Sequence, residues 1–88
     1  MKTIYKFELM LTSEQLLLLP DGSEVLDIQE QGGNIYAWVK LDTSNPDRER
    51  KFVICGTGNP IEETNLLHIS TLQMGMIVWH FFEDLTPN

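Results

Sequence analysis

The amino-acid sequence predicts a mainly β protein: a small antiparallel sandwich or barrel of about six strands, with room for one short helical turn. Turn-forming residues recur roughly every dozen positions, which is typical of all-β domains, at 20–22, 32–34, 44–47 and 56–60. Residues 75–83, Gly-Met-Ile-Val-Trp-His-Phe-Phe-Glu, offer apolar side chains to both faces of an extended strand. Such a strand needs cover on two sides, from a second layer or from another copy of the chain.

The first predicted strand covers residues 2–10. Apolar and polar residues alternate there, with Tyr5, Phe7 and Leu9 on the inward side and Lys6 and Glu8 toward water. The next segment, 13–19, is ambiguous, because Ser13 could cap a short helix and the leucines that follow fit a helix or a strand. We favour an extended piece, since a helix of under two turns is marginal. The alternative is a single helical turn.

Residues 24–30 and 35–41 predict an antiparallel hairpin around the turn at 32–34. In the returning strand one face carries small and aliphatic residues, and the other carries Tyr36 and Trp38. We therefore expect this strand at the centre of a sheet or at a subunit contact.

The C-terminal half predicts a polar surface loop at 42–50 and three strands, at 51–55, 65–72 and 76–83. Residues 61–65 could form a helical turn. Gly75 predicts a tight turn or a bulge between the last two strands. Together these elements predict a single β domain over 1–85 and a disordered tail at 86–88.

Composition narrows the function classes. The chain has 88 residues with thirteen acidic and six basic side chains, a net charge of -7, which opposes attraction to bulk nucleic acid or to an anionic membrane surface. Its longest apolar run, 16–19, is too short to span a bilayer, and the N-terminus does not read as a signal peptide. Cys55 stands alone, so no intramolecular disulfide can form. We expect an acidic, cytoplasmic protein with no bound cofactor.

The inventory for catalysis is thin. His68 and His80 have no diagnostic spacing to a nucleophile or carboxylate, and no third ligand completes a metal site with them. A histidine such as His80, between Trp79 and Phe81, is more often a hydrogen-bonded structural residue than a catalyst. We therefore assign no catalytic and no metal-binding residue, and expect no enzyme. An enzyme that uses His80 with a nearby carboxylate is the minor alternative.

Two features could bind an anion. The loop Gly56-Thr57-Gly58 could offer backbone amides, although a turn that ends a strand needs the same residues. Arg48, Arg50 and Lys51 form the only basic cluster, and across the hairpin Tyr36 and Trp38 could stack beside a guanidinium. Solvated charges at a strand end explain the cluster equally simply, and Asp47 and Glu49 are interleaved with it.

Aromatic surplus points to binding instead. Trp38, Trp79, Phe81 and Phe82 would fill a core first, but a domain of this size has room for only one modest core. The remainder predicts a contact surface, so we expect a homodimer or larger assembly and a protein partner.

Several segments resemble a family of short bacteriophage and prophage proteins of unknown function. These are the opening Met-Lys-Thr-Ile-Tyr-Lys, the turn 19–23, the Gly-Thr-Gly loop and the aromatic-His ending at 75–83. The resemblance covers nearly the whole chain, while the leucine run 16–19 departs from the more polar family pattern. It implies a phage-encoded accessory protein in the cytoplasm of the infected cell, and no activity comes with it. The leading expectation is non-enzymatic binding of a host protein, with counter-defence as one form. The alternative is an oligomer that sequesters a small anionic ligand such as a signalling nucleotide.

Overall fold

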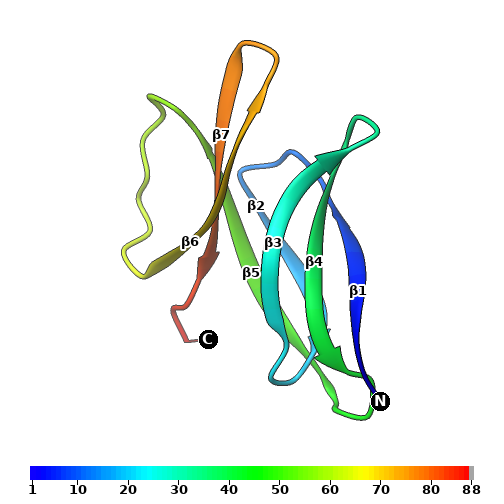
Figure 1. The fold of residues 1–88 in the computed structure, drawn as a ribbon. Coiled ribbons are helices and arrows are strands. Elements are labelled where there is room, and N and C mark those ends of the chain that lie inside the picture. The colour runs from blue at the N-terminus through cyan, green and yellow to red at the C-terminus, as the bar shows by residue number, and fades with distance from the viewer. Residues whose placement is uncertain (88) are drawn as a thin grey trace.

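The structure is a computed structural model, and it describes residues 1–87 (Figure 1). These residues form seven strands and no helix: β1 (Lys2–Leu9), β2 (Glu14–Pro20), β3 (Glu24–Gln31), β4 (Asn34–Asp42), β5 (Asp47–Gly56), β6 (Leu66–Met74) and β7 (Ile77–Asp84). The expected β class is confirmed. Residue 88, part of the predicted tail, lies outside the described residues.

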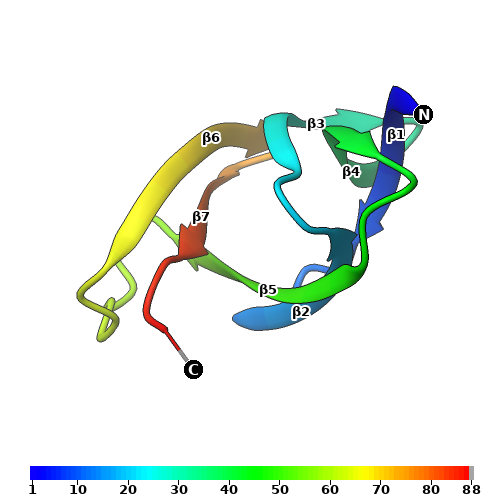
Figure 2. The ribbon, with the colours of Figure 1, turned by 90° about the horizontal axis from the view of Figure 1, so that it is seen from below.

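The strands form two antiparallel sheets that face each other as a sandwich. One sheet has the order β1-β4-β3 and the other the order β2-β5-β7-β6 (Figures 1 and 2). β3 and β6 come together where the sheets meet, and Ser70 Oγ donates a hydrogen bond of 2.8 Å to the carbonyl of Ile28. The sandwich is therefore confirmed, and the closed barrel was the wrong alternative.

Two predicted tight turns are present. Gln31 pairs with Asn34 across Gly32 and Gly33, whose φ angles of 61° and 88° belong to the left-handed region that glycine enters without strain. Met74 pairs with Ile77, so Gly75 serves a turn and not a bulge. The bulges lie elsewhere, between Val25 and Asp27 and between His68 and Ser70. Sequence reasoning found neither bulge.

The 13–19 segment is extended, as favoured, and forms β2, so its helical-turn alternative was wrong. The helical turn considered at 61–65 is absent as well. The polar loop predicted at 42–50 shrinks to 43–46, because β4 continues through Asp42 and β5 begins at Asp47. Charged residues of β5 pair in register with the leucines of β2, which supply the ladder hydrogen bonds that a free loop would lack.

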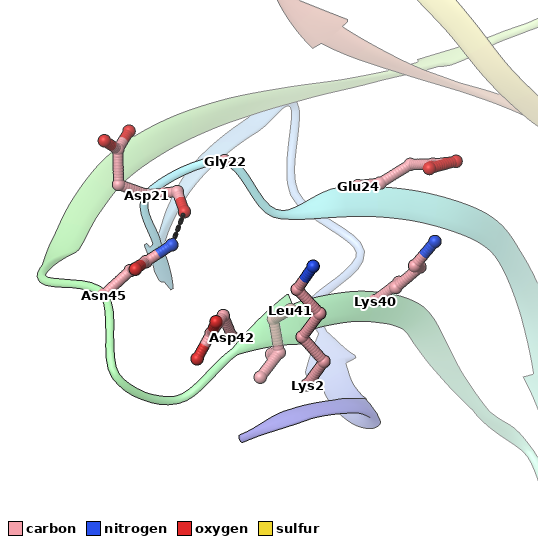
Figure 3. A pocket seen from close by; sticks show the side chains of 8 residues that line it. All are labelled: Lys2, Asp21, Gly22, Glu24, Lys40, Leu41, Asp42 and Asn45. Carbon is pink, nitrogen blue, oxygen red and sulfur yellow. Dashed lines mark hydrogen bonds between the residues drawn. The ribbon is translucent and has the colours of Figure 1, made fainter.

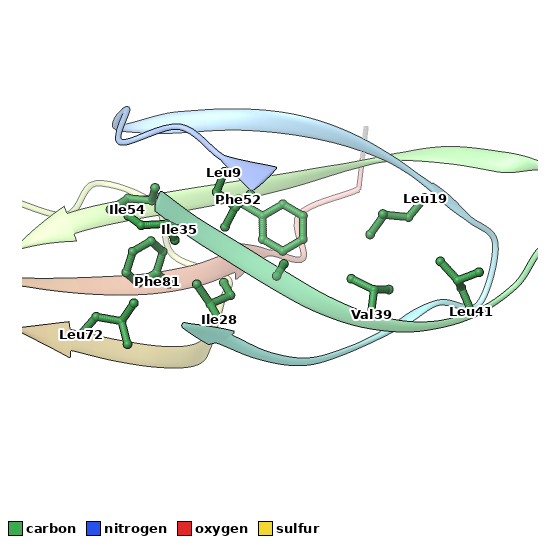
Figure 4. Close-up of a cluster of buried hydrophobic side chains, with 11 residues drawn as sticks. Leu9, Leu19, Ile28, Ile35, Val39, Leu41, Phe52, Ile54, Leu72 and Phe81 are labelled. Carbon is green, nitrogen blue, oxygen red and sulfur yellow. The ribbon is translucent and has the colours of Figure 1, made fainter. Parts of the chain in front are cut away.

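The core lies between the sheets (Figure 4). Alternate residues of β4 point into it, and β5 and β7 contribute the two largest buried side chains, Phe52 and Phe81, each 1% exposed. The inward-facing set is completed by aliphatic side chains, namely Leu9, Leu19, Ile28, Ile35, Ala37, Val39, Leu41, Ile54 and Leu72. Tyr5, predicted inward, is half exposed, because β1 is an edge strand and its neighbour does not cover it.

The predicted surplus of apolar surface is visible. Trp38, Trp79 and Phe82 are half-buried, so the core does not enclose them. Large exposed apolar side chains also lie on the surface, and most are aliphatic: Ile4, Met10, Leu11, Leu16, Leu18, Leu26, Ile61, Leu67, Met76, Ile77 and Leu85. Two pairs of these residues lie together: Ile4 and Leu26 on the outer face of the three-stranded sheet, and Leu16 and Leu18 on the outer face of the four-stranded sheet.

Candidate functional site

The outer face of the three-stranded sheet gathers aromatic, aliphatic and basic side chains. β4 is the central strand there, and strand alternation that sends its small residues into the core sends Tyr36 and Trp38 outward. Their rings meet edge to face, with centroids 6.1 Å apart and planes at 68°. Lys6 from β1 places its Nζ 4.4 Å from the Tyr36 ring centroid, and it also donates to Gln31 Oε1 at 2.9 Å.

Two exposed aliphatic residues extend this surface. Ile4, 54% exposed, lies on β1 opposite Lys40, and Lys6 lies opposite Trp38. Leu26, 45% exposed, is the extra residue of the β3 bulge, and it precedes Asp27, which pairs with Trp38 of β4. We call Ile4, Lys6, Leu26, Tyr36 and Trp38 the aromatic face.

The outer face of the three-stranded sheet differs in charge from the rest of the protein surface. Lys2, Lys6 and Lys40 point outward from this sheet and make no ion pair within residues 1–87, whereas Arg48, Arg50 and Lys51 are each ion-paired. Four acidic residues share the outer face, Glu8, Glu24, Asp27 and Asp42, and the other nine lie elsewhere. The aromatic face is therefore close to electrically balanced, while the remaining surface is strongly acidic.

A shallow hollow of about 230 Å³ borders the aromatic face near the N-terminus (Figure 3). The amines of Lys2 and Lys40 reach it, but the carboxylates of Asp21, Glu24 and Asp42 line it too. Asp21 is ion-paired with Arg48, and Asp42 with the N-terminal ammonium of Met1, so charges of both signs meet at the hollow.

The predicted basic cluster is not assembled. Arg48 is exposed, with its Nε 3.0 Å from Asp21. Arg50 points between the sheets and forms a bidentate ion pair with Glu83. Its Nε lies 2.6 Å from Oε2, and its Nη2 lies 2.8 Å from Oε1. The Glu83 hydrogen bonds raise the pKa of Arg50 above its ordinary value.

Lys51 lies apart from both arginines, on the outer face of the four-stranded sheet. Its Nζ is 3.0 Å from the Glu14 carboxylate and 3.7 Å from Asp84. The hydrogen bond to Glu14 raises the pKa of Lys51 above its ordinary value. Lys51 thus lies on the opposite face of β5 from Arg48 and Arg50, and each of the three side chains makes a separate ion pair.

The Gly-Thr-Gly loop is structural in this arrangement. A Cβ on Gly56 would lie 3.2 Å from the Trp79 ring and 3.0 Å from Asn59 Nδ2, so the glycine makes room for them. Thr57 N donates to Val78 O at 3.1 Å, and Asn59 N donates to Gly56 O at 3.0 Å. Gly58 is exposed at the tip with a φ of 93°. Within the loop, the Thr57 amide is therefore taken up by its bond to β7, which leaves fewer amides free to bind an anion.

His80 belongs to a chain of hydrogen bonds on the outer face of the four-stranded sheet. Its Nε2 is 2.7 Å from Thr57 Oγ1, its Nδ1 is 3.0 Å from Thr71 Oγ1, and that hydroxyl is 2.8 Å from His68 Nε2. His68 does not face His80, because the register of the hairpin sets Thr71 opposite His80 and His68 opposite Phe82. Both ring nitrogens of His80 therefore lie beside hydroxyl groups, and no carboxylate within residues 1–87 hydrogen-bonds to the ring.

In the described part of the chain, no three side chains of His, Cys, Asp or Glu come together in a group that could hold a metal ion. Likewise, residues 1–87 contain no helix long and apolar enough to cross a membrane.

The sequence predicts ten residues for partner or ligand binding: Tyr36, Trp38, Arg48, Arg50, Lys51, Gly56, Thr57, Gly58, Trp79 and His80. Of these, only Tyr36 and Trp38 belong to the aromatic face, while Thr57 lies 2.7 Å from His80 on the other sheet. Trp79 packs beside Gly56 and lies on the other sheet. Sequence reasoning missed Ile4, Lys6 and Leu26. Ile4 and Lys6 could have been found, because both fall on the outward parity of the first strand. Leu26 could not, because a bulge changes that parity without a sequence signal.

The fold and this surface define the class of the protein: an all-β sandwich domain with an apolar and aromatic sheet face open to solvent. The chain belongs to the family described as a domain of unknown function, DUF7352, which matches residues 1–88. The predicted membership of a family without an assigned function is thereby confirmed. Neither a curated protein nor a solved structure matches the chain.

Proposed function

We propose that this domain acts by binding a protein partner through the aromatic face, without catalysis. The observation behind the proposal is the solvent-facing pair Tyr36 and Trp38, set on a rigid central strand and bordered by three lysines without ion pairs in residues 1–87. Tryptophan and tyrosine are enriched among the residues that dominate binding energy at interfaces, and both rings here lose little freedom on binding.

The size of the face limits the interaction. Three strands at roughly 4.8 Å spacing and eight residues of about 3.4 Å each give a sheet face of roughly 10 by 27 Å. A standard interface covers about 800 Å² on each partner, so a partner must also reach the rim, including the hollow near Lys2. Affinity then depends on a few anchors, with Trp38 at the centre.

The chemistry of the face indicates the chemistry of the partner. Three lysines and four carboxylates share this sheet face, so it suits a partner surface with charges of both signs around an apolar centre. The acidic remainder of the protein lies on other surfaces, and at physiological salt charges more than about 8 Å away are largely screened. A partner that approaches this face therefore meets the aromatic rings and the lysines and carboxylates that border them.

The biological setting of the proposal follows from the resemblance to short phage and prophage proteins. In that setting the chain is a phage-encoded accessory protein that occupies a host protein in the cytoplasm of the infected cell, and inhibition of a defence protein is one form of this role. The alternative, sequestration of a small anionic ligand, would use the Gly56–Gly58 amides with Arg48, Arg50 or Lys51. Each of these cations is ion-paired with a carboxylate, which a ligand would have to displace.

Comparative capture from host lysate tests the proposal. Wild-type protein, Trp38→Ala and Met76→Ser are immobilised side by side; Met76 is 99% exposed at the tip of the β6–β7 hairpin and serves as the matched control. Loss of a central anchor should cost about 2 kcal/mol or more, roughly thirty-fold in Kd. A host protein that is retained by wild type and Met76→Ser and lost from Trp38→Ala supports the proposal.

Equal capture by all three proteins, or no specific capture by any, would contradict it. Circular dichroism of each variant checks that Trp38→Ala remains folded. A thermal-shift panel of cyclic and linear nucleotides runs in parallel, because tight binding of any one raises the melting temperature by mass action. We expect no shift, and a shift of several degrees would favour the sequestration alternative.

A further inference from the structure

We propose that β2 is a self-association edge: it pairs antiparallel with β2 of a second copy, with Leu17 opposite Leu17 at the two-fold axis. This extends the four-stranded sheet into a continuous eight-stranded sheet. The joint uses the edge of one sheet, whereas the aromatic face covers the outside of the other, so the two proposals stand or fall separately.

The direction of the backbone groups of β2 follows from its ends. In an antiparallel pair, alternate residues direct both their N–H and C=O groups to the same neighbour. Ser13 O accepts from Ile54 N at 3.0 Å, and Asp21 N donates to Pro46 O at 2.7 Å, one step beyond each end of the β2–β5 register. Odd-numbered residues of β2 therefore bond to β5. Even-numbered residues direct their backbone groups to the open edge.

At both ends of β2, backbone groups that point to the open edge are already hydrogen-bonded or absent. The Glu14 carbonyl accepts from Thr12 Oγ1 at 3.0 Å. Pro20 has no N–H, and its carbonyl accepts from Ser23 N at 3.1 Å. Within residues 1–87, this leaves Leu16 and Leu18 as the even-numbered residues of β2 with both backbone groups unbonded.

The free backbone groups of Leu16 and Leu18 can pair with the same groups of a second copy. A two-fold axis at Leu17 sets Leu16 opposite Leu18 of the second copy, and the reverse, so that two hydrogen-bonded pairs use all four free groups of each strand. A shift of two residues one way sets Leu16 opposite Pro20. The opposite shift sets Leu18 against the occupied carbonyl of Glu14. A shift of one residue would reverse the faces of every side chain.

The side chains fit the same joint. Leu16 and Leu18 are 58% and 61% exposed on the outer face, and in this register they form a cluster of four leucines across the axis. Lys51 lies beside Leu16 and Glu49 beside Leu18 on β5, so each row across the joint begins with a cation and ends with an anion.

Comparison with β1 shows why β2 is the edge that pairs. Natural proteins protect sheet edges with charges, and the outward positions of β1 include Lys2, Lys6 and Glu8. β2 has no charged residue between Glu14 and Asp21. An unprotected apolar edge with a short window of free backbone groups favours a partner strand of equal length, which a second copy supplies. The small area of an edge joint predicts a dissociation constant on the order of micromolar.

Sedimentation velocity over a range of roughly 1 to 300 µM tests the dimer. Wild type should shift from monomer to dimer. Leu18→Lys, which places two lysines diagonally across the axis inside the leucine cluster, should stay monomeric throughout, and Met76→Lys, a matched lysine at an exposed hairpin tip, should dimerise like wild type. Leu18→Pro removes an edge N–H without breaking the β2–β5 ladder and should also be monomeric. If Leu18→Pro does not fold, Leu18→Lys still decides.

A cysteine scan in a Cys55→Ala background tests the register. Opposed residues in a non-hydrogen-bonded pair have Cα atoms about 4.5 Å apart, within disulfide range. Leu17→Cys should therefore form a disulfide-linked dimer under mild oxidation, and Leu16→Cys should not. A wild type that stays monomeric at the highest concentration, a Leu18→Lys that dimerises normally, or a Leu16→Cys that crosslinks faster than Leu17→Cys would overturn the proposal.

Discussion

Replacement of Glu83 by glutamine tests how the sandwich is held together at the end nearest the C-terminus. The Glu83 side chain is 8% exposed and that of Arg50 is 22% exposed, and the guanidinium also donates to the carbonyl of Ser23. Glu83→Gln keeps the shape but leaves the Arg50 charge without its counter-ion. Removing one partner of a buried ion pair costs about 3–5 kcal/mol, and the residual exposure of Arg50 places this case near about 3 kcal/mol.

That loss is large enough to measure directly. For a domain of this size, 1 kcal/mol lowers the melting temperature by about 4–8 °C, so Glu83→Gln should melt about 12–24 °C lower. Urea unfolding followed by circular dichroism gives the free energy of unfolding. Glu14→Gln is the matched control: it removes a carboxylate from the more exposed Lys51 pair and should cost under about 1 kcal/mol.

The double variant Arg50→Met with Glu83→Leu sharpens the test. It removes both charges, so it should recover most of the stability that Glu83→Gln loses. A Glu83→Gln cost below about 1 kcal/mol, equal to that of Glu14→Gln, would show that the pair is solvated and refute the reasoning.

Three further outcomes are expected. Phe52→Ala removes a ring that is 1% exposed between the sheets and should cost about 3–5 kcal/mol in urea unfolding; a cost below 1 kcal/mol would contradict the assigned core. Hydrogen bonds from the Ser44 and Thr86 amides lower the pKa of Asp42 and Asp84, so their stabilisation is present above the ordinary value of 3.8 and is lost as pH falls below it; NMR titration of the carboxyl carbons should show both midpoints displaced downward. His80→Gln should leave partner capture unchanged, because His80 lies on the four-stranded sheet and the aromatic face lies on the other. Loss of capture in this variant would indicate that the partner binds the four-stranded sheet.

Sequence reasoning predicted the class and most strands because turns and alternation are local signals. Gly32 and Gly33 supplied the conformations that a two-residue hairpin needs, and the alternation of 35–41 separated core from surface correctly. The start of β5 was misread because its first residues, from Asp47 to Arg50, are polar. Their strand conformation comes from pairing with the leucines of β2, a contact distant in sequence.

The candidate site was predicted less well for a related reason. Arg48, Arg50 and Lys51 are neighbours in sequence, but strand alternation sends adjacent side chains to opposite faces, and Arg50 enters the interior to pair with Glu83. The aromatic face assembles from three strands whose order, β1-β4-β3, only the structure provides. The leucine run 16–19 departs from the more polar pattern of the phage proteins that the chain resembles, and in the structure it lies on β2, an edge strand of the four-stranded sheet.

Fluorescence of single-tryptophan variants tests the central claim most directly, because the chain has two tryptophans on different sheets. The captured host partner is added to Trp79→Phe, which keeps only Trp38, and to Trp38→Phe, which keeps only Trp79. We predict that Trp38 emission shifts to shorter wavelength and becomes protected from acrylamide quenching, while Trp79 does not respond. A response from Trp79 with none from Trp38 would contradict binding through the aromatic face.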